Sequence, residues 1–272
     1  MSETEKGKAV NLVSFMSDFG LRDNYVGVVK GIMMKINPDL KIVDISHGIT
    51  PFATGEANYL LTTAYHYFPK ETVHLVVVDP GVGTDRAALI LRSASHIFVG
   101  PDNGVFTNLI QHEGIKCFVI RREALNEAAG INPGQSRTFD GRDLFGPAAA
   151  LLSRGAKIED LTEPMKDDPF LLERPFADRK GKIRIRIIHV DHFGNIITDL
   201  HRSHLKDGLK VISVKTKENI INEISQNYHD VPEGELLALW GSNGYLEISV
   251  NQGNAAKSLA YKTGDSVEAD LE

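Results

Sequence analysis

The run VVVDPGVGTDR, residues 76–86, constrains the fold more than any other stretch of the chain. Three consecutive valines end at Asp79, a proline and two glycines follow, and Arg86 comes seven positions after the acid. A β-branched apolar run bounded by turn residues predicts a buried strand. The acid and the arginine therefore lie at the carboxyl end of a strand, where open α/β folds bind their ligands. The two charges either take part in chemistry or only close the loop.

Strand and helix patterns alternate through the first 155 residues. Strands are expected at residues 11–16, 40–45, 73–78, 87–91, 96–99 and 116–120. Helices are expected at residues 25–36, 55–67, 105–111 and 144–154. This rhythm predicts an α/β domain in which helices flank a mainly parallel sheet.

The pattern changes in the segment 159–182, which is rich in charge and proline. Short alternating runs follow, at residues 183–190, 209–216, 235–239, 245–250 and 266–271. Such runs, separated by turn residues, predict a smaller all-β domain with a barrel-like sheet. We therefore expect an N-terminal α/β domain at residues 1–165, a linker at 166–182 and a C-terminal β domain at 183–272.

Composition limits the partners and the compartment. The chain has 272 residues, 42% of them hydrophobic, and a net charge of −6, which disfavours nonspecific nucleic-acid binding. Its one cysteine, Cys117, excludes an intrachain disulfide and a thiolate metal cluster, and its apolar neighbours favour a buried structural thiol. The polar N-terminus lacks the apolar core of a secretory signal, and no apolar run approaches the ~20 residues of a membrane span. We expect a cytoplasmic protein.

Polar residues follow the first predicted strand. Asp23 and Asn24 stand at the start of the next helix, where Asp and Asn stabilise unpaired backbone N–H groups, so capping is their simpler interpretation. Asp18 lies at the carboxyl end of the strand itself. A carboxylate there is equally suited to accept hydrogen bonds from ribose hydroxyls, as acidic residues do in dinucleotide sites.

Three segments that contain glycine have simple turn interpretations. The GVG after Asp79 lacks both the third glycine of GxGxxG and a GK[ST] sequence, so we reject a phosphate-binding loop. PDNG, residues 101–104, has the composition of a turn. TFDGRD, residues 138–143, is either a solvated turn in which Asp143 caps the following helix, or a second polar wall of a site.

The segment HVDHFGN, residues 189–195, ends a predicted strand with polar side chains. Residues three apart on a strand point to opposite faces, so His189 and His192 do not suggest a shared metal ion. Asp191 and Asn195 either form ordinary Asx turns or offer a hydrogen-bonding edge to a planar ring. The sequence contains no HExxH and no other clustered metal ligands, so we expect no metal site. It also lacks GxSxG, the motif of a serine nucleophile.

Seven segments occur in a distinctive order along the chain: FMSDFGLRDNYVGVVKG, VDISHGITPF, VVVDPGVGT, VGPDNG, TFDGRDLFGP, VDHFGNIITDL and GSNGYLEISVNQGNAA. Together they resemble the S-adenosylmethionine (SAM) hydrolase family, the SAM hydroxide adenosyltransferases, which are related to the SAM-dependent fluorinase and chlorinase. The resemblance extends from about residue 11 to the C-terminus. It implies hydrolysis of SAM to adenosine and L-methionine, with SAM as substrate and no cofactor. It also implies a homotrimer that binds SAM between one subunit's N-terminal domain and its neighbour's C-terminal domain.

The resemblance also implies roles for individual residues. Asp79 and Arg86 match the acid and the arginine beside the attacking water, and Asp18 would hold the ribose hydroxyls. The other substrate-contacting positions that it implies are Asp23, Asn24, Tyr25 and Phe52 in the N-terminal domain, and Asp191, Asn195, Ser242, Asn243, Glu247 and Val250 in the C-terminal domain.

One position departs from the family pattern. The hydrolases usually carry histidine where this chain has Asp140 in TFDGRD. An ionised aspartate cannot donate a hydrogen bond, and it adds negative charge to the site. Asp140 could accept the proton of water, or pair with Arg86 or Arg142. We hypothesise that Asp140 takes over the function of the missing histidine in catalysis.

Two other functions fit the same resemblance. The fluorinase has an insertion before VGPDNG, whereas residues 87–99 are short here, and it has hydroxyl residues where this chain has Val82 and Gly141. The chlorinase shares the glycine, so a chlorinase-like halogenase stays open, although Asp79 and Arg86 favour water. The third possibility is a SAM- or adenosine-binding protein that lost turnover through Asp140.

Overall fold

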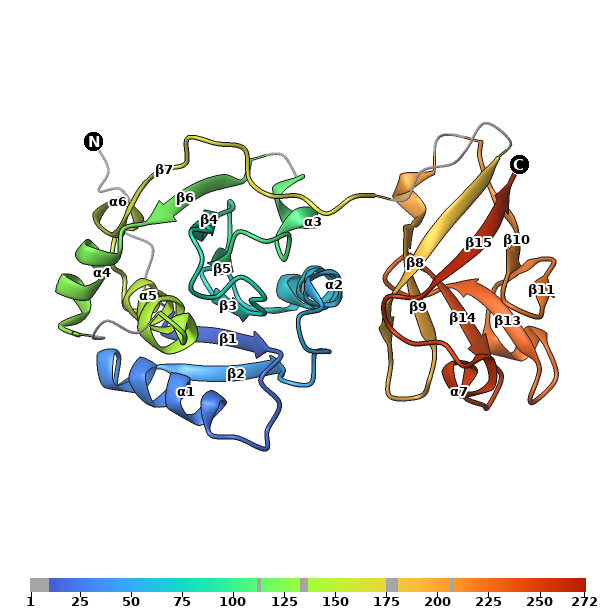
Figure 1. The fold of residues 1–272 in the computed structure, drawn as a ribbon, viewed down its shortest axis with the longest axis horizontal. Coiled ribbons are helices and arrows are strands. Elements are labelled where there is room, and N and C mark those ends of the chain that lie inside the picture. The colour runs from blue at the N-terminus through green and yellow to red at the C-terminus, as the bar shows by residue number, and fades with distance from the viewer. Residues whose placement is uncertain (1–9, 112–113, 133–136, 175–180, 206–207) are drawn as a thin grey trace. The chain divides into compact units, whose positions relative to one another are not determined.

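The computed structural model describes residues 10–111, 114–132, 137–174, 181–205 and 208–272. The chain divides into two compact units, Met1–Leu172 and Glu173–Glu272 (Figure 1). The division lies within the segment 166–182 that was expected to link two domains. The limits of that linker stay a prediction, since residues 175–180 are outside the described part of the chain.

The N-terminal unit contains a seven-stranded sheet in the order β2-β1-β3-β5-β4-β6-β7. Neighbouring strands are parallel from β2 to β5, and β4 and β7 run against their neighbours, so five of the seven strands share one direction. The strands are β1 (Leu12–Ser17), β2 (Lys41–Ser46), β3 (Val73–Val77), β4 (Ala88–Arg92), β5 (Ile97–Pro101), β6 (Lys116–Ile120) and β7 (Thr162–Pro164).

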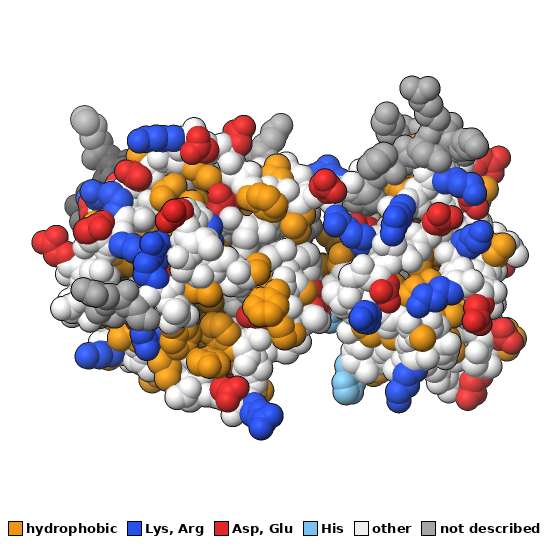
Figure 2. All heavy atoms as spheres, in the orientation of Figure 1, with side chains coloured by type: hydrophobic (Ala, Val, Ile, Leu, Met, Phe, Trp, Pro, Cys, Tyr) orange, Lys and Arg blue, Asp and Glu red, His pale blue; other side chains and the backbone are white. Residues whose placement is uncertain are grey.

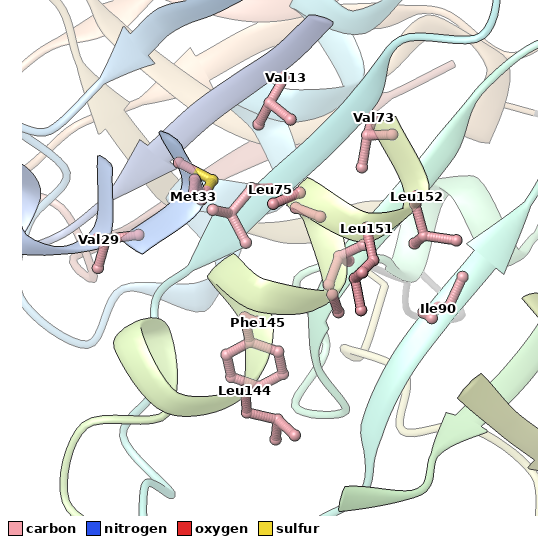
Figure 3. Packing of buried hydrophobic residues seen from close by; sticks show 14 of the residues in the cluster. Val13, Val29, Met33, Val73, Leu75, Ile90, Leu144, Phe145, Leu151 and Leu152 are labelled. Carbon is pink, nitrogen blue, oxygen red and sulfur yellow. The ribbon is translucent and has the colours of Figure 1, made fainter. Parts of the chain in front are cut away.

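Helices cover both faces of this sheet, which explains why every residue of β3 is buried. Along β3, Leu75 packs in one buried cluster with Met33 of α1 and Leu151 of α5, as Figure 3 shows, while Val76 belongs to a second cluster that includes Leu61 of α2. The helices are α1 (Tyr25–Ile36), α2 (Thr54–Ala64), α3 (Thr107–Ile110), α4 (Arg122–Ala129), α5 (Gly146–Ser153) and α6 (Ile158–Leu161).

The predicted elements of this unit are present, with three additions and one altered helix start. The sequence patterns missed α4, α6 and β7, which are short. The helix expected at 144–154 begins earlier, as a π-helical turn, Gly141–Phe145, that continues into α5. The tight backbone explains a glycine there, because a Cβ atom at Gly146 would lie 2.7 Å from the carbonyl oxygen of Gly141.

The C-terminal unit is an eight-stranded, nearly closed, barrel-like sheet in the order β11-β10-β15-β8-β9-β14-β13-β12. Its two ends approach each other, because β10 contacts β12 and β11 contacts β13. The strands are β8 (Lys182–Val190), β9 (Ile196–His201), β10 (Val211–Lys215), β11 (Ile220–Ile221), β12 (Ile224–Ser225), β13 (Leu236–Trp240), β14 (Tyr245–Val250) and β15 (Ser266–Leu271).

The predicted fold class, an α/β domain followed by a smaller all-β barrel-like domain, is confirmed. In this second unit the sequence patterns missed β9, whose apolar run is interrupted by Thr198 and Asp199, as well as the two-residue strands β11 and β12 and the helix α7 (Ala255–Leu259). Positive and negative side chains are interspersed over the face shown in Figure 2, without an extended basic area among its described residues. None of the described helices has the length and apolar character that a bilayer span requires.

Candidate active site

Two carboxylates follow neighbouring parallel strands at the same edge of the N-terminal sheet. Ser17, the last residue of β1, is in register with Val77, the last residue of β3. Asp18 follows directly, and Asp79 comes two residues after β3. Burial raises the pKa of Asp18, and the negative charge of Asp79 adds to this effect. The predicted meeting of charged groups at the carboxyl edge is therefore present.

The loop after β3 folds back so that Arg86 reaches Asp79. Arg86 Nε donates to Asp79 Oδ1 at 2.8 Å, and Nη2 donates to Oδ2 of the same carboxylate. Oδ1 also accepts the backbone N–H of Gly81 at 3.2 Å, while Gly83 adopts a φ of 83°, which favours glycine. The glycines thus shape the turn that lets acid and arginine pair, in agreement with the rejection of a phosphate-binding loop.

Asp140 lies on the other side of the same arginine. Arg86 Nη2 donates to Asp140 Oδ2 at 2.6 Å, and the side chains of Arg86, Asp79 and Asp140 are only 9%, 6% and 3% exposed. The interpretation of TFDGRD as a solvated turn is wrong, because Asp140 and Asp143 are both buried. The π-helical turn directs them inward, and such turns often occur at functional sites.

A second arginine, which the sequence analysis did not identify, completes this cluster. Arg122, the first residue of α4, donates from Nη2 to Asp140 Oδ1 at 2.8 Å. Arg142, which was considered as a partner of Asp140, instead forms a two-pronged pair with Asp143 at 2.6 and 2.7 Å. No motif marks Arg122; only recognising α4 after β6 would have drawn attention to it.

The four side chains Asp79, Arg86, Asp140 and Arg122 form a chain of alternating charge, which we call the acid–arginine chain. Burial lowers the pKa of the Arg86 guanidinium, but hydrogen bonds and charges from Asp79 and Asp140 outweigh it and raise that pKa. The guanidinium also lies 5.1 Å from the ring centre of Phe145. Arg86 Nη1 donates to no described residue, so two N–H groups are left for a ligand.

Asp18 is tied to the loop that carries Phe52. Its Oδ2 accepts the backbone N–H of Phe52 at 2.8 Å, and Phe52 has a φ of 68° and an exposed ring. Ser17 and His47 link the same two loops, since Ser17 Oγ lies 2.7 Å from His47 Nδ1. The other ring nitrogen of His47 lies 3.1 Å from Asp44. Asp18 and Phe52 thus lie close together, and their roles toward a ligand stay a prediction.

Aromatic rings line the edge beside Asp140. Phe19, Tyr25 and Phe139 form a cluster in which the ring centres are 5.4–5.8 Å apart. A Cβ atom at Gly141 would lie 3.3 Å from the ring of Phe19, so this glycine faces the cluster. Flat apolar surface beside carboxylates suits a ligand that has both a ring and hydroxyl groups.

Asp23 and Asn24 lie exposed on the loop before α1, and Tyr25 is half exposed. The capping interpretation is wrong for Asn24, because its side chain makes no capping hydrogen bond and only its backbone carbonyl accepts from Val28, at 2.9 Å. The side chain of Asn24 is thereby left for another role.

Two smaller expectations have clear outcomes. Pro101 of PDNG ends β5 and the other three residues form a bend, in which Asn103 donates to the carbonyl of Val78 at 2.9 Å and supports the backbone beside Asp79. Cys117 lies in β6 and is half-buried, and burial raises the pKa of its thiol, as expected for a structural cysteine.

In the C-terminal unit, the β8–β9 loop is closed by its own side chains. Asp191 Oδ1 accepts the backbone N–H groups of Phe193 and Asn195, both at 2.9 Å, and Oδ2 accepts the Asn195 side-chain amide at 2.9 Å. The Asx-turn interpretation is therefore confirmed. A Cβ atom at Gly194 would lie 2.1 Å from Asn254, so only glycine fits this loop. His192 lies in the same loop, beyond the end of β8.

Glu247 of β14 is a buried carboxylate held by hydroxyl groups. Its Oε1 accepts from Tyr228 at 2.6 Å and from Ser249 at 2.7 Å. Burial, the hydrogen bond to Glu247 and the charges of Glu247 and Asp191 all raise the pKa of Tyr228, so Asp191 lies within electrostatic reach of the same phenol. Tyr228 was missed in the sequence because no motif surrounds it.

The remaining C-terminal candidates flank this carboxylate along the chain. Ser242 and Asn243 are exposed in the turn between β13 and β14, and Val250 ends β14. Within the described residues there is no group of three or more histidine, cysteine or acidic side chains that could hold a metal ion.

Known protein domains match each of the two units. The N-terminal domain of the SAM hydroxide adenosyltransferases matches residues 13–162, and the C-terminal domain of that family matches residues 185–268. The (R)-S-adenosyl-L-methionine hydrolase of Thermus thermophilus is 36% identical, over 93% of this chain and 96% of its own. The fluorinase of Nocardia brasiliensis is 26% identical, over 96% of this chain and 97% of its own.

A solved structure agrees with this relationship. An uncharacterized conserved protein from Thermotoga maritima superposes with a TM-score of 0.80 at 34% identity, covering 95% of this chain and 99% of its own. Both units therefore match, in order, over nearly the whole chain, and the protein belongs to the SAM hydroxide adenosyltransferase family.

Proposed function

We propose that the protein hydrolyses SAM to adenosine and L-methionine by attack of water on C5′ of the ribose. The observation that carries the proposal is the cluster of Asp79, Arg86 and Asp140 at the carboxyl edge of the sheet, in a chain that matches this family over both units. The hydrolase relative is named for the (R) epimer of SAM, and we extend that preference to this protein.

The chemistry asks little of the leaving group. Water oxygen bonds to C5′, the C5′–S bond breaks, and its electron pair converts the sulfonium into the neutral thioether of methionine, so no general acid is needed. The water must instead be held in line with that bond, and positioning can supply ~7–11 kcal/mol of the barrier. Arg86 is suited to this role because its cation favours hydroxide character and Nη1 is directed to no described residue.

The carboxylates divide the remaining work. Asp79 Oδ1 already accepts from Arg86 and Gly81, but Oδ2 accepts from Arg86 alone and can take a second hydrogen bond, so Asp79 can orient the water and accept its proton through Oδ2. Asp140 fixes Arg86 from the opposite side and takes the place of the family's histidine in this arrangement. The proton released from water leaves to solvent.

Substrate binding would use both units. Asp18 accepts from the ribose hydroxyls, and Phe52 and Tyr25 pack on the ligand beside Asp23 and Asn24. In the C-terminal unit, Asp191 and Asn195 meet the methionine end or the adenine edge, and the adenine-binding segment comprises Ser242, Asn243, Glu247 and Val250. No metal or other cofactor takes part.

We further propose a homotrimer in which SAM binds between the N-terminal unit of one subunit and the C-terminal unit of its neighbour. Light scattering coupled to size-exclusion chromatography should give three times the mass of the 30.0 kDa chain. A monomer that turns over SAM at full rate would remove this intersubunit arrangement while leaving the reaction intact.

Incubation of the pure protein with SAM, followed by nucleoside and amino-acid chromatography, tests the reaction. Adenosine and methionine should appear in equal amounts, and addition of chloride or fluoride should give no 5′-halo-adenosine. A halogenated nucleoside would identify a halogenase. Thermal stabilisation by SAM without any product would identify a binding protein instead.

A further inference from the structure

Asp140 is a buried carboxylate held between two arginines that differ in their surroundings. Arg86 Nη2 binds Oδ2 from a nearly buried side chain, whereas Arg122 Nη2 binds Oδ1 from a side chain that is 33% exposed. Arg122 lies on the wall of an open cleft of about 710 Å³, which Arg86, Arg121 and Arg137 also line. The cleft thus brings solvent to the outer end of the acid–arginine chain.

Charge balance explains why two arginines are needed. Arg86 alone faces two carboxylates, Asp79 and Asp140, which leaves one uncompensated negative charge in a nearly dry cluster. A buried ion is stable only when it is paired and its hydrogen bonds are satisfied. Arg122 supplies the second positive charge and occupies the oxygen of Asp140 that Arg86 does not reach.

An unpaired Asp140 would change the position of the Arg86 guanidinium and would not act on the substrate directly. Without Arg122, the free oxygen and full charge of Asp140 compete with the attacking water for the remaining N–H groups of Arg86. If Asp140 pulls the Arg86 guanidinium toward itself, the guanidinium moves away from the attacking water. A displacement of about 1 Å in an aligned site can cost roughly a hundredfold in rate.

We propose that Arg122 is a positioning residue, which neutralises and fixes Asp140 from the solvent cleft and so keeps Arg86 directed at the attacking water. This assignment rests on the proposed SAM hydrolysis. It predicts an effect on kcat rather than on KM, since Arg122 acts through Asp140 and Arg86 on the nucleophile and not on SAM.

The test compares wild type, Arg122→Ala, Asp140→Asn and the double variant, with Arg121→Ala as matched control. Arg121 precedes Arg122 and lines the same cleft, but its side chain binds the backbone carbonyl of Asp160 at 3.2 Å. Arg122→Ala should lower kcat about tenfold to a hundredfold and change KM for SAM less than threefold, while Arg121→Ala leaves both unchanged.

The double variant keeps the test valid if Arg122→Ala alone does not fold, because Asp140→Asn removes the charge that would be left buried. Loss of Arg122 should have no further effect on kcat in the Asp140→Asn background. An additional tenfold loss there would show that Arg122 does not act through Asp140, and would overturn the proposal.

Chemical rescue adds a measurement that a structural role would not affect. Arg122→Ala vacates a site open to the cleft, so guanidinium ion at about 10 mM should restore part of kcat, and sodium at equal ionic strength should not. Wild-type kcat in Arg122→Ala would overturn the positioning role. Absence of adenosine with the wild type would instead reject the hydrolase function itself, so the two failures are distinguishable.

Discussion

The carboxylates of the two units are held by different kinds of hydrogen-bond donor. In the N-terminal unit, Asp79 and Asp140 are bound by arginine side chains. In the C-terminal unit, Asp191 is bound by backbone and amide N–H groups, and Glu247 by two hydroxyl groups. A cation cancels the charge of a carboxylate, whereas a neutral donor stabilises and orients that charge without cancelling it. The first arrangement suits chemistry at a reacting atom, and the second suits recognition of a polar ligand edge.

The largest effect should follow from removing the shared cation. Arg86→Ala leaves Asp79 without its cation and Asp140 with Arg122 alone, so turnover should fall about 10²–10³-fold and the folded state should lose about 3–5 kcal/mol. Steady-state kinetics and urea unfolding measure the two losses. Arg86→Lys retains the charge but loses the two-pronged geometry, and it should recover stability more than rate. Full activity in Arg86→Lys would show that charge alone suffices.

A smaller loss is expected at Asp140. Asp140→Ala leaves Arg86 and Arg122 without their shared partner, so kcat should decrease about tenfold to a hundredfold. Asp167→Ala, at an exposed position on the same cleft, is the control and should behave as wild type. Unchanged turnover with an unaltered pH profile in Asp140→Ala would end the hypothesis that Asp140 replaces the histidine.

The comparison extends to the other end of β3, where the buried polar groups are neutral. Ser14 lies 2.6 Å from His74, and His74 lies 3.2 Å from His96. Burial, followed by the charge of His96, lowers the pKa of His74 to about 3. An unfolded histidine titrates near 6.5, so this group contributes stability above about pH 6.5 that is lost as pH falls toward 3.

Unfolding in urea, followed by circular dichroism between pH 7 and pH 4, measures this loss. His74→Gln should be less stable at pH 7 but should lose less stability on acidification than wild type does. His192→Gln, at an exposed position, should lose as much stability between pH 7 and pH 4 as wild type does. An equal loss of stability on acidification in wild type and His74→Gln would assign the acid sensitivity to other groups.

The smallest effect should come from a neutral donor in the C-terminal unit. Tyr228→Phe removes one hydroxyl from Glu247, a loss of about 1 kcal/mol that corresponds to roughly a fivefold increase in KM for SAM. The rate constant kcat should remain within twofold, because Glu247 is assigned to binding. Tyr67→Phe, at an exposed tyrosine, serves as control. A decrease of kcat without a change of KM would break the distinction between the two units.

Local patterns in the sequence were sufficient for much of the fold and for the pair at its centre. The valine run and the turn residues after it identified β3. The spacing of apolar residues identified α1, β1 and β14. The pairing of Asp79 with Arg86 was also accessible, because the two residues are seven positions apart across a single turn. The family resemblance added the chemistry that such a pair can perform.

The sequence by itself determined the two domains, their element types and which acids follow strand ends, since these depend on hydrophobic period and short-range turn chemistry. Only the tertiary structure decided how the charges pair. Asp140 had arginines on several segments as possible partners, and sign alone does not select among them. The π-helical turn directs Asp140 inward, and the position of α4 brings Arg122 to it. Contacts of this kind depend on which elements pack together, a property that no local pattern encodes.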